Sequence, residues 1–152
     1  MLIRRQIQAV MLSAAIATSA IAAQAPQPAV QSSEPTQDLR QLVAPIALYP
    51  DALVGQILAG ATYPTQVVDA ARWIRDNPDL KGEQLAAEVD KQPWDPSIKA
   101  LTQFPSVLDN MNQNLSWTSS LGDAYFNDPQ NVMSAIQALR ADAEREIGRA
   151  HV

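Results

Sequence analysis

The large apolar residues between positions 38 and 148 recur at the spacing of one face of an α-helix. In the first clear example, residues 53–61, they follow the order i, i+1, i+4, i+5, i+8, which places them on one side of a helix. Three further stripes lie in residues 67–74, 117–125 and 132–147, and the last is the longest. The sequence contains no alternating run of β-branched residues long enough for a strand. We therefore predict an all-α fold.

Prolines and aspartates mark where these helices begin. Asp95-Pro96 and Asp128-Pro129 each place a capping carboxylate before a proline, and proline is tolerated at the first helical position because its missing N–H has no partner there anyway. Pro50-Asp51, Pro64 and Pro105 fit helix starts as well. We expect six to eight short helices in a compact irregular array around one core.

Other residues predict where helices end and how the last one is charged. Pro45 predicts a short or kinked first helix and Pro78 a stop, while Gly60 and Gly148 are expected as C-terminal caps. Along the last helix, charged residues three or four positions apart predict ion pairs worth a few tenths of a kcal/mol each; they are Arg140–Glu144, Asp142–Arg145 and Glu146–Arg149.

The first 22 residues are typical of a cleaved signal peptide. Arg4 and Arg5 form a basic start, an apolar stretch from Ala9 to Ala22 follows, and Ala20-Ile21-Ala22 supplies a cleavage site. An uncleaved membrane anchor is the alternative, but the apolar stretch is shorter than the ~20 residues that span a bilayer. We expect a periplasmic or secreted protein with no stable membrane insertion after cleavage.

Residues 23–37 are rich in Pro, Gln and Ser and contain a single large apolar residue, Val30. Such a segment buries too little surface to offset its ordering entropy, so we interpret it as a flexible linker before a helical domain at residues 38–148. Removal of residues 1–22 would change the net charge from −5 to −7. Because binding to nucleic acid needs clustered Lys and Arg, a nucleic-acid partner is not expected.

The composition leaves few side chains for standard catalysis. The 152-residue chain has no Cys, and its one histidine, His151, stands next to the C-terminal residue. A thiol nucleophile, a Ser-His couple and a histidine-based zinc site are therefore hard to build. Residues 110–121 lack the Gly and Glu that a calcium loop of the EF-hand type requires. We expect no catalytic residue, metal or cofactor.

Aromatic residues beside prolines are candidates for binding. Tyr49, Tyr63 and Trp94 each adjoin or lie near a proline at a predicted turn, where an aromatic ring either packs across helix ends or forms a surface patch. Such a patch would bind a peptide, a glycan or another envelope protein. Trp73 and Trp117 lie on or near helix stripes and are expected in the core, although Trp117 is also kept as a binding candidate.

Three aspartates complete the set of candidates. Asp51 and Asp95 fall at predicted helix starts, where capping explains a carboxylate more simply than catalysis does. Asp123 lies beside Gly122 in the middle of a predicted helix and is expected to make a buried hydrogen bond or to line a cleft.

Four stretches together resemble a bacterial family, the exported proteins of domain of unknown function family 3300. They are LVAPIALYPDAL at 42–53, YP through AARW at 63–73, QPWDPSIKAL at 92–101, and Trp117 with LGDA at 121–124. The resemblance covers roughly residues 38–147 and implies an exported helical envelope domain with no settled activity, cofactor or catalytic residues.

Three hypotheses for function follow. The first is a non-enzymatic module of the cell envelope that binds an envelope protein or glycan. The second is a glycan hydrolase that uses carboxylates alone, with Asp95 and Asp123 as its acid–base pair. The third is a structural or self-associating scaffold module. The sequence does not determine the oligomeric state.

Overall fold

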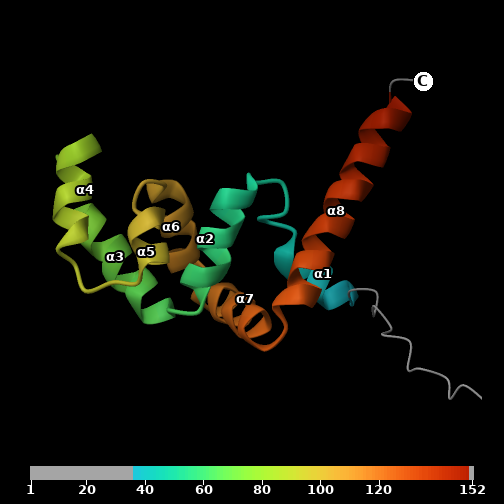
Figure 1. Ribbon diagram of the computed structural model, residues 1–152, viewed down its shortest axis with the longest axis horizontal. Coiled ribbons are helices and arrows are strands. Elements are labelled where there is room, and N and C mark those ends of the chain that lie inside the picture. Colours follow the sequence, from blue (N-terminus) through green and yellow to red (C-terminus); the bar gives the residue numbers. More distant parts are fainter. Residues whose placement is uncertain (1–35, 151–152) are drawn as a thin grey trace, which may run out of the picture. The chain divides into compact units, whose positions relative to one another are not determined.

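The computed structural model describes residues 36–150, and within them every regular element is an α-helix (Figure 1). The helices are α1 (Gln37–Val43), α2 (Asp51–Ala61), α3 (Pro64–Asp76), α4 (Gly82–Asp90), α5 (Pro96–Leu101), α6 (Pro105–Gln113), α7 (Leu115–Asn127) and α8 (Pro129–Ala150). The all-α prediction is confirmed. The predicted signal peptide and almost all of the predicted linker lie outside the described residues.

The predicted helix starts are confirmed, and two of them are capped by a side-chain hydrogen bond. The Asp95 carboxylate accepts the backbone N–H of Ser97 at 2.9 Å, and the Asp128 carboxylate accepts that of Asn131 at 3.0 Å. The four prolines predicted at first helical positions begin their helices: Pro64, Pro96, Pro105 and Pro129. A capping carboxylate marks the starts of α5 and α8, whereas α3 and α6 begin at a proline without a side-chain cap.

Two predicted helix ends are wrong. Gly60 lies inside α2 and Gly148 inside α8, so neither is a C-terminal cap. At Gly60 the reason is tertiary packing, because a Cβ atom there would lie 2.7 Å from the Cδ1 atom of Leu101. A side chain at this position would displace the end of the Leu101 side chain, so glycine allows α5 to pack closely on α2. The short first helix expected from Pro45 is confirmed, since α1 has seven residues and ends at Val43.

Helix α2 forms the centre of the core. It packs against α5 on one side and against α7 on another, while α3 packs on α6 (Figure 1). Ile57 and Leu58 of α2 are fully buried, as are Leu101 of α5 and Leu121 of α7. Among the described residues, no buried side-chain nitrogen or oxygen lacks a hydrogen-bond partner, which is typical of a well-formed native interior.

The longest helix, α8, is buried along only part of its apolar stripe. Val132 and Ile136 are buried and Leu139 packs against the core, whereas Ile147 is 62% exposed. Helix α1 lies beside α8 (Figure 1). The stripe thus continues beyond the part of the helix that the core covers. No helix within residues 36–150 combines the length and the apolar character needed to cross a membrane.

Candidate functional site

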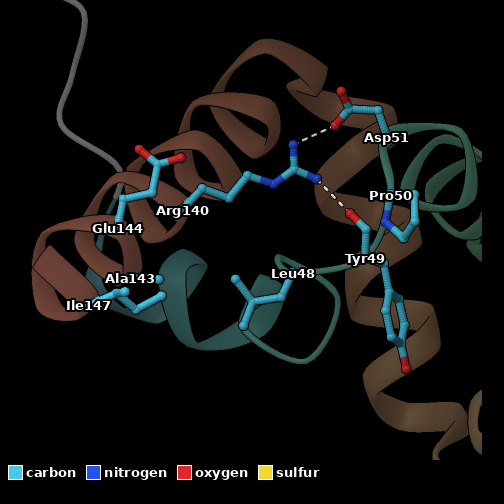
Figure 2. Close-up of a pocket in the computed structure, with 8 residues that line it drawn as sticks. All are labelled: Leu48, Tyr49, Pro50, Asp51, Arg140, Ala143, Glu144 and Ile147. Carbon is cyan, nitrogen blue, oxygen red and sulfur yellow. Dashed lines mark hydrogen bonds and ion pairs between the residues drawn. The ribbon is translucent and has the colours of Figure 1, made fainter.

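An open groove lies between the outer half of α8 and the loop that joins α1 to α2 (Figure 2). Its volume is about 440 Å³, and it is largely open to solvent. The residues that line it are Leu48, Tyr49, Pro50, Asp51, Arg140, Ala143, Glu144 and Ile147.

Arg140 holds the loop side of this groove in place. Its Nε donates to the carbonyl of Ala47 at 2.6 Å, and one terminal nitrogen donates to the carbonyl of Tyr49 at 2.8 Å. The other terminal nitrogen forms an ion pair with Asp51 (Figure 2). Because a guanidinium is planar and its donors point in fixed directions, these three contacts hold residues 47–51 against α8.

The ion pair expected between Arg140 and Glu144 does not form within the described chain. Arg140 reaches the loop instead, where two carbonyls and the Asp51 carboxylate accept its hydrogen bonds. Three acceptors at a partly buried site outweigh one exposed pair along the helix, which is worth a few tenths of a kcal/mol. The other two expected pairs, Asp142–Arg145 and Glu146–Arg149, are confirmed.

The groove therefore presents apolar side chains beside negative charge. Leu48 is 74% exposed and Ile147 is 62% exposed, and each lies on a different side of the groove (Figure 2). Glu144 is exposed, and no cation within residues 36–150 pairs with it. Exposed large aliphatic residues gathered in a concave surface are typical of interaction sites.

A second set of charges anchors α1 to α8. Asp142 forms ion pairs with both Arg40 of α1 and Arg145 of α8. The hydrogen bond from Arg40 holds the pKa of the Asp142 carboxyl below its ordinary value, and Arg145 contributes to the same effect. Asp142 therefore stays ionised and helps to keep α1, and with it the start of the loop, against α8.

The sequence-predicted candidates divide between the two ends of α2. Tyr49 and Asp51 lie at its start and line the groove, and Tyr49 also lines a small cavity that includes Trp117. Tyr63 and the Trp94–Asp95 pair lie beyond its other end. The 11 residues of α2 span about 16 Å. The three proline-associated aromatic residues therefore do not form one surface patch.

Asp51 and Trp117 each make one specific contact near the start of α2. Asp51 is the first residue of α2 and makes no capping hydrogen bond to its backbone; its carboxylate pairs with Arg140 instead. The Nε1 of Trp117 donates to the carbonyl of Leu42 at 2.8 Å. Trp117 is partly buried and packs against the core, as expected from its place on a helix stripe.

At the other end of α2, the rings of Trp94 and Trp73 pack against each other. Their ring centroids are 5.8 Å apart and their planes meet at 82°, a favourable edge-to-face arrangement. Trp94 is partly buried against the core. Trp94 therefore packs against neighbouring helices, and most of its surface is not accessible to a binding partner.

Asp95 is occupied by local hydrogen bonds. The Ser97 hydroxyl donates to it at 2.6 Å in addition to the Ser97 N–H, and the backbone N–H of Asp95 donates to the side chain of Gln66 at 2.7 Å. The Ser97 hydroxyl, then the Ser97 N–H, lower the pKa of Asp95, partial burial opposes them, and Tyr63 adds a smaller lowering. A lowered pKa does not suit a general acid.

Asp123 is exposed on α7 and makes no buried hydrogen bond. It lines a small hollow of about 100 Å³ together with Thr62, Pro64 and Phe126. The hollow does not include Asp95.

Sequence reasoning named two of the eight residues that line the groove, Tyr49 and Asp51, and missed the other six. The sequence predicts an ion pair between Arg140 and Glu144, which gives neither residue a role in binding. Leu48 and Ile147 are absent from the sequence-based binding candidates. The signal for Ile147 was present, because it ends an apolar stripe that is longer than the others. The role of Arg140 depends on acceptors some 90 positions away in the chain, which no local pattern indicates.

Comparison with known proteins agrees with the resemblance noted in the sequence. The family described as "Protein of unknown function (DUF3300)" matches residues 35–149. The chain belongs to this family. The DUF3300 match contains all eight helices of the described residues apart from the last residue of α8. The groove and the hydrogen bonds around Asp95 therefore both belong to the family domain.

One relative of this DUF3300 chain is "Uncharacterized protein YacH" of Escherichia coli (strain K12), which is 45% identical over 116 residues. The alignment covers 76% of this chain and 19% of YacH, so the chain spans about a fifth of the length of that relative. No solved structure matches the chain.

Proposed function

We propose that this DUF3300 domain is an exported, non-enzymatic module that binds a protein of the cell envelope in the groove between residues 48–51 and α8. The observation that carries the proposal is the combination of Leu48 and Ile147, both exposed, with a loop that Arg140 fixes in place. A site that is ordered before its partner arrives loses less conformational entropy on binding.

The export part of the proposal rests on the sequence of residues 1–22, with its basic start, apolar stretch and Ala20-Ile21-Ala22. To test it, the full chain with a C-terminal epitope tag is expressed in a Gram-negative bacterium and the cells are fractionated. We expect a product that begins at Ala23 in the periplasm or the medium. A full-length product in the cytoplasm would contradict it.

The glycan-hydrolase alternative receives less support from the candidate carboxylates. Asp95 accepts two hydrogen bonds from Ser97 and its pKa is lowered, whereas the acid of a glycosidase pair needs a raised pKa. Asp123 is exposed and lines a separate small hollow that does not include Asp95. The binding module is therefore the function that the described residues support best.

Site-specific photo-crosslinking in living cells tests the binding part. A photoreactive phenylalanine analogue replaces Leu48 in the groove, and in a control it replaces Phe104, which is 44% exposed and lies outside the groove. We expect a discrete adduct from position 48 that disappears when Ile147→Ser is added, and no such adduct from position 104.

The outcomes of this crosslinking are distinct. No adduct at position 48, or the same adduct at position 104, would refute the groove as the binding site. An adduct of twice the chain mass that contains only this protein would instead support the self-associating scaffold.

A further inference from the structure

We infer that the groove binds a basic, aliphatic segment of its protein partner, in which a Lys or Arg stands close to a Leu, Ile or Val. This inference rests on the proposed function and adds the chemical class of the partner. It follows from the two kinds of surface that line the groove, which are apolar and negatively charged.

The apolar surface lies on both sides of the groove. Leu48 projects from the loop, while Ala143 and Ile147 line the α8 side (Figure 2). An aliphatic side chain placed between them would bury surface on Leu48 and Ile147, which are 74% and 62% exposed. Burial of apolar surface contributes about 25 cal/mol per Å², so this contact supplies affinity without regard to charge.

The accessible charge of the groove is negative. Arg140 brings the only cation among the lining residues, but its side chain is 21% exposed and its Nε and both terminal nitrogens already donate to the loop. Asp51 remains 79% exposed despite its ion pair, and Glu144 has no cationic partner within residues 36–150. An approaching ligand therefore meets two carboxylates and a guanidinium that is already engaged.

This arrangement favours a basic partner over other envelope components. Anionic lipid head groups and phosphate-rich polymers would be repelled by Asp51 and Glu144. A second copy docked through the same groove by two-fold symmetry would add its own Asp51 and Glu144 to the interface, and an excess of like charge there is unfavourable. A cationic side chain beside an aliphatic one satisfies both surfaces.

The purified full chain is titrated with three labelled peptides of equal length that alternate Leu with Lys, Gln or Glu, and fluorescence anisotropy reports binding. We expect the Lys peptide to bind most tightly, the Gln peptide more weakly and the Glu peptide weakest. The preference for Lys over Gln should shrink as salt is raised from 50 to 500 mM, because exposed charges are screened.

Three variants localise the binding. Glu144→Gln should weaken the Lys peptide two- to fivefold, the range that corresponds to an exposed ion pair, and should leave the Gln peptide unchanged. Glu146→Gln is the matched control, since Glu146 lies two positions away on α8, is exposed, and does not line the groove. Ile147→Ser should weaken the binding of the Lys peptide and of the Gln peptide to the same extent. Circular dichroism verifies that each variant is folded.

The outcomes separate this inference from the proposed function. If the Gln peptide binds as tightly as the Lys peptide and only Ile147→Ser weakens binding, the basic partner is wrong and the groove remains a binding site. If peptides bind but neither Glu144→Gln nor Ile147→Ser matters, the groove itself is wrong. If no peptide binds at millimolar concentration, the basic aliphatic partner is wrong.

Discussion

Gly122 of α7 lies directly against the backbone of Ala61, the last residue of α2. A Cβ atom added at Gly122 would lie 2.6 Å from the carbonyl carbon of Ala61, closer still to its oxygen, and 3.0 Å from the nitrogen of Thr62. Backbone atoms cannot move aside as a flexible side chain can. Gly122 therefore sets the distance at which α7 packs on the central helix.

The first prediction concerns this contact. Gly122→Ala should destabilise the protein by about 3 kcal/mol or more, at the upper end of the usual cost of overpacking, because α7 would have to separate from α2. Gly55→Ala is the matched control. Gly55 lies within α2, and nothing stands within 4 Å of its added Cβ atom.

The control should have the opposite sign. Alanine is more favourable than glycine in a helix interior by about 1 kcal/mol, so Gly55→Ala should raise stability. Urea denaturation followed by circular dichroism measures both. Equal effects of the two substitutions, or a neutral Gly122→Ala, would show that the approach of α7 to α2 is looser than described.

The second prediction concerns Arg140. Arg140→Met should destabilise the protein by about 2 kcal/mol or more, because it leaves the carbonyl of the buried Ala47 without its donor and an unpaired buried acceptor costs about 1–3 kcal/mol. Arg140→Lys should recover only part of the loss, since an ammonium group cannot reproduce the fork of donors.

Asp51→Asn provides the comparison for Arg140. Asp51 is largely exposed, and exposed ion pairs contribute about 0–1 kcal/mol, so this change should alter stability by less than 1 kcal/mol. Thermal unfolding measures the three variants. An Arg140→Met protein as stable as Asp51→Asn would mean that the two carbonyl contacts do not hold the loop.

The sequence predicted the features of the fold that depend on neighbouring residues. Asp95 and Asp128 cap helices because their carboxylates reach backbone N–H groups two or three positions ahead, and that reach is a property of the local sequence. The prediction that Gly60 caps the end of a helix was wrong, because Gly60 lies inside α2, where its small size leaves room for Leu101. The sequence does not show which helix will pack at that point.

The groove shows the same limit more strongly. Tyr49 and Asp51 were among the candidates, but their partner Arg140 lies about 90 positions later in the chain. A pattern three or four positions apart predicted an Arg140–Glu144 pair, and the fold offered Arg140 more acceptors elsewhere. Local charge patterns therefore predict exposed ion pairs within one helix well. They predict poorly the ion pairs between residues that lie far apart in the sequence.

The third prediction concerns Asp95 and pH. Asp95→Ala should cost about 1 kcal/mol at pH 7, the usual value for losing an N-cap, whereas Asp95→Asn keeps a good capping side chain and should cost less. Because the pKa of Asp95 is lowered in the folded protein, its ionised form contributes stability above the unfolded value near 3.9. This contribution is lost as pH falls through the folded pKa.

The stability difference between the wild type and Asp95→Ala should therefore be constant from about pH 5 to pH 7 and shrink below about pH 4. Chemical denaturation at a series of pH values measures it. A difference that grows in acid would mean that protonated rather than ionised Asp95 is the form that caps α5.

The last prediction concerns the hydrogen bond that connects α7 to the end of α1. Trp117→Phe keeps most of the aromatic surface but removes the Nε1–H that donates to the carbonyl of Leu42 at 2.8 Å. Loss of one such bond costs about 1 kcal/mol. Trp94→Phe is the control, since Trp94 is also partly buried against the core but its Nε1 has no hydrogen-bond partner among the described residues.

Trp117→Phe should therefore be less stable than Trp94→Phe by about 1 kcal/mol. Far-ultraviolet circular dichroism is the appropriate signal in urea, because tryptophan fluorescence changes in both variants. Since Leu42 precedes the loop that Arg140 fixes, the Trp117 variant should also weaken binding in the groove. A variant that loses stability but binds normally would show that the Arg140 contacts alone are sufficient to hold the loop.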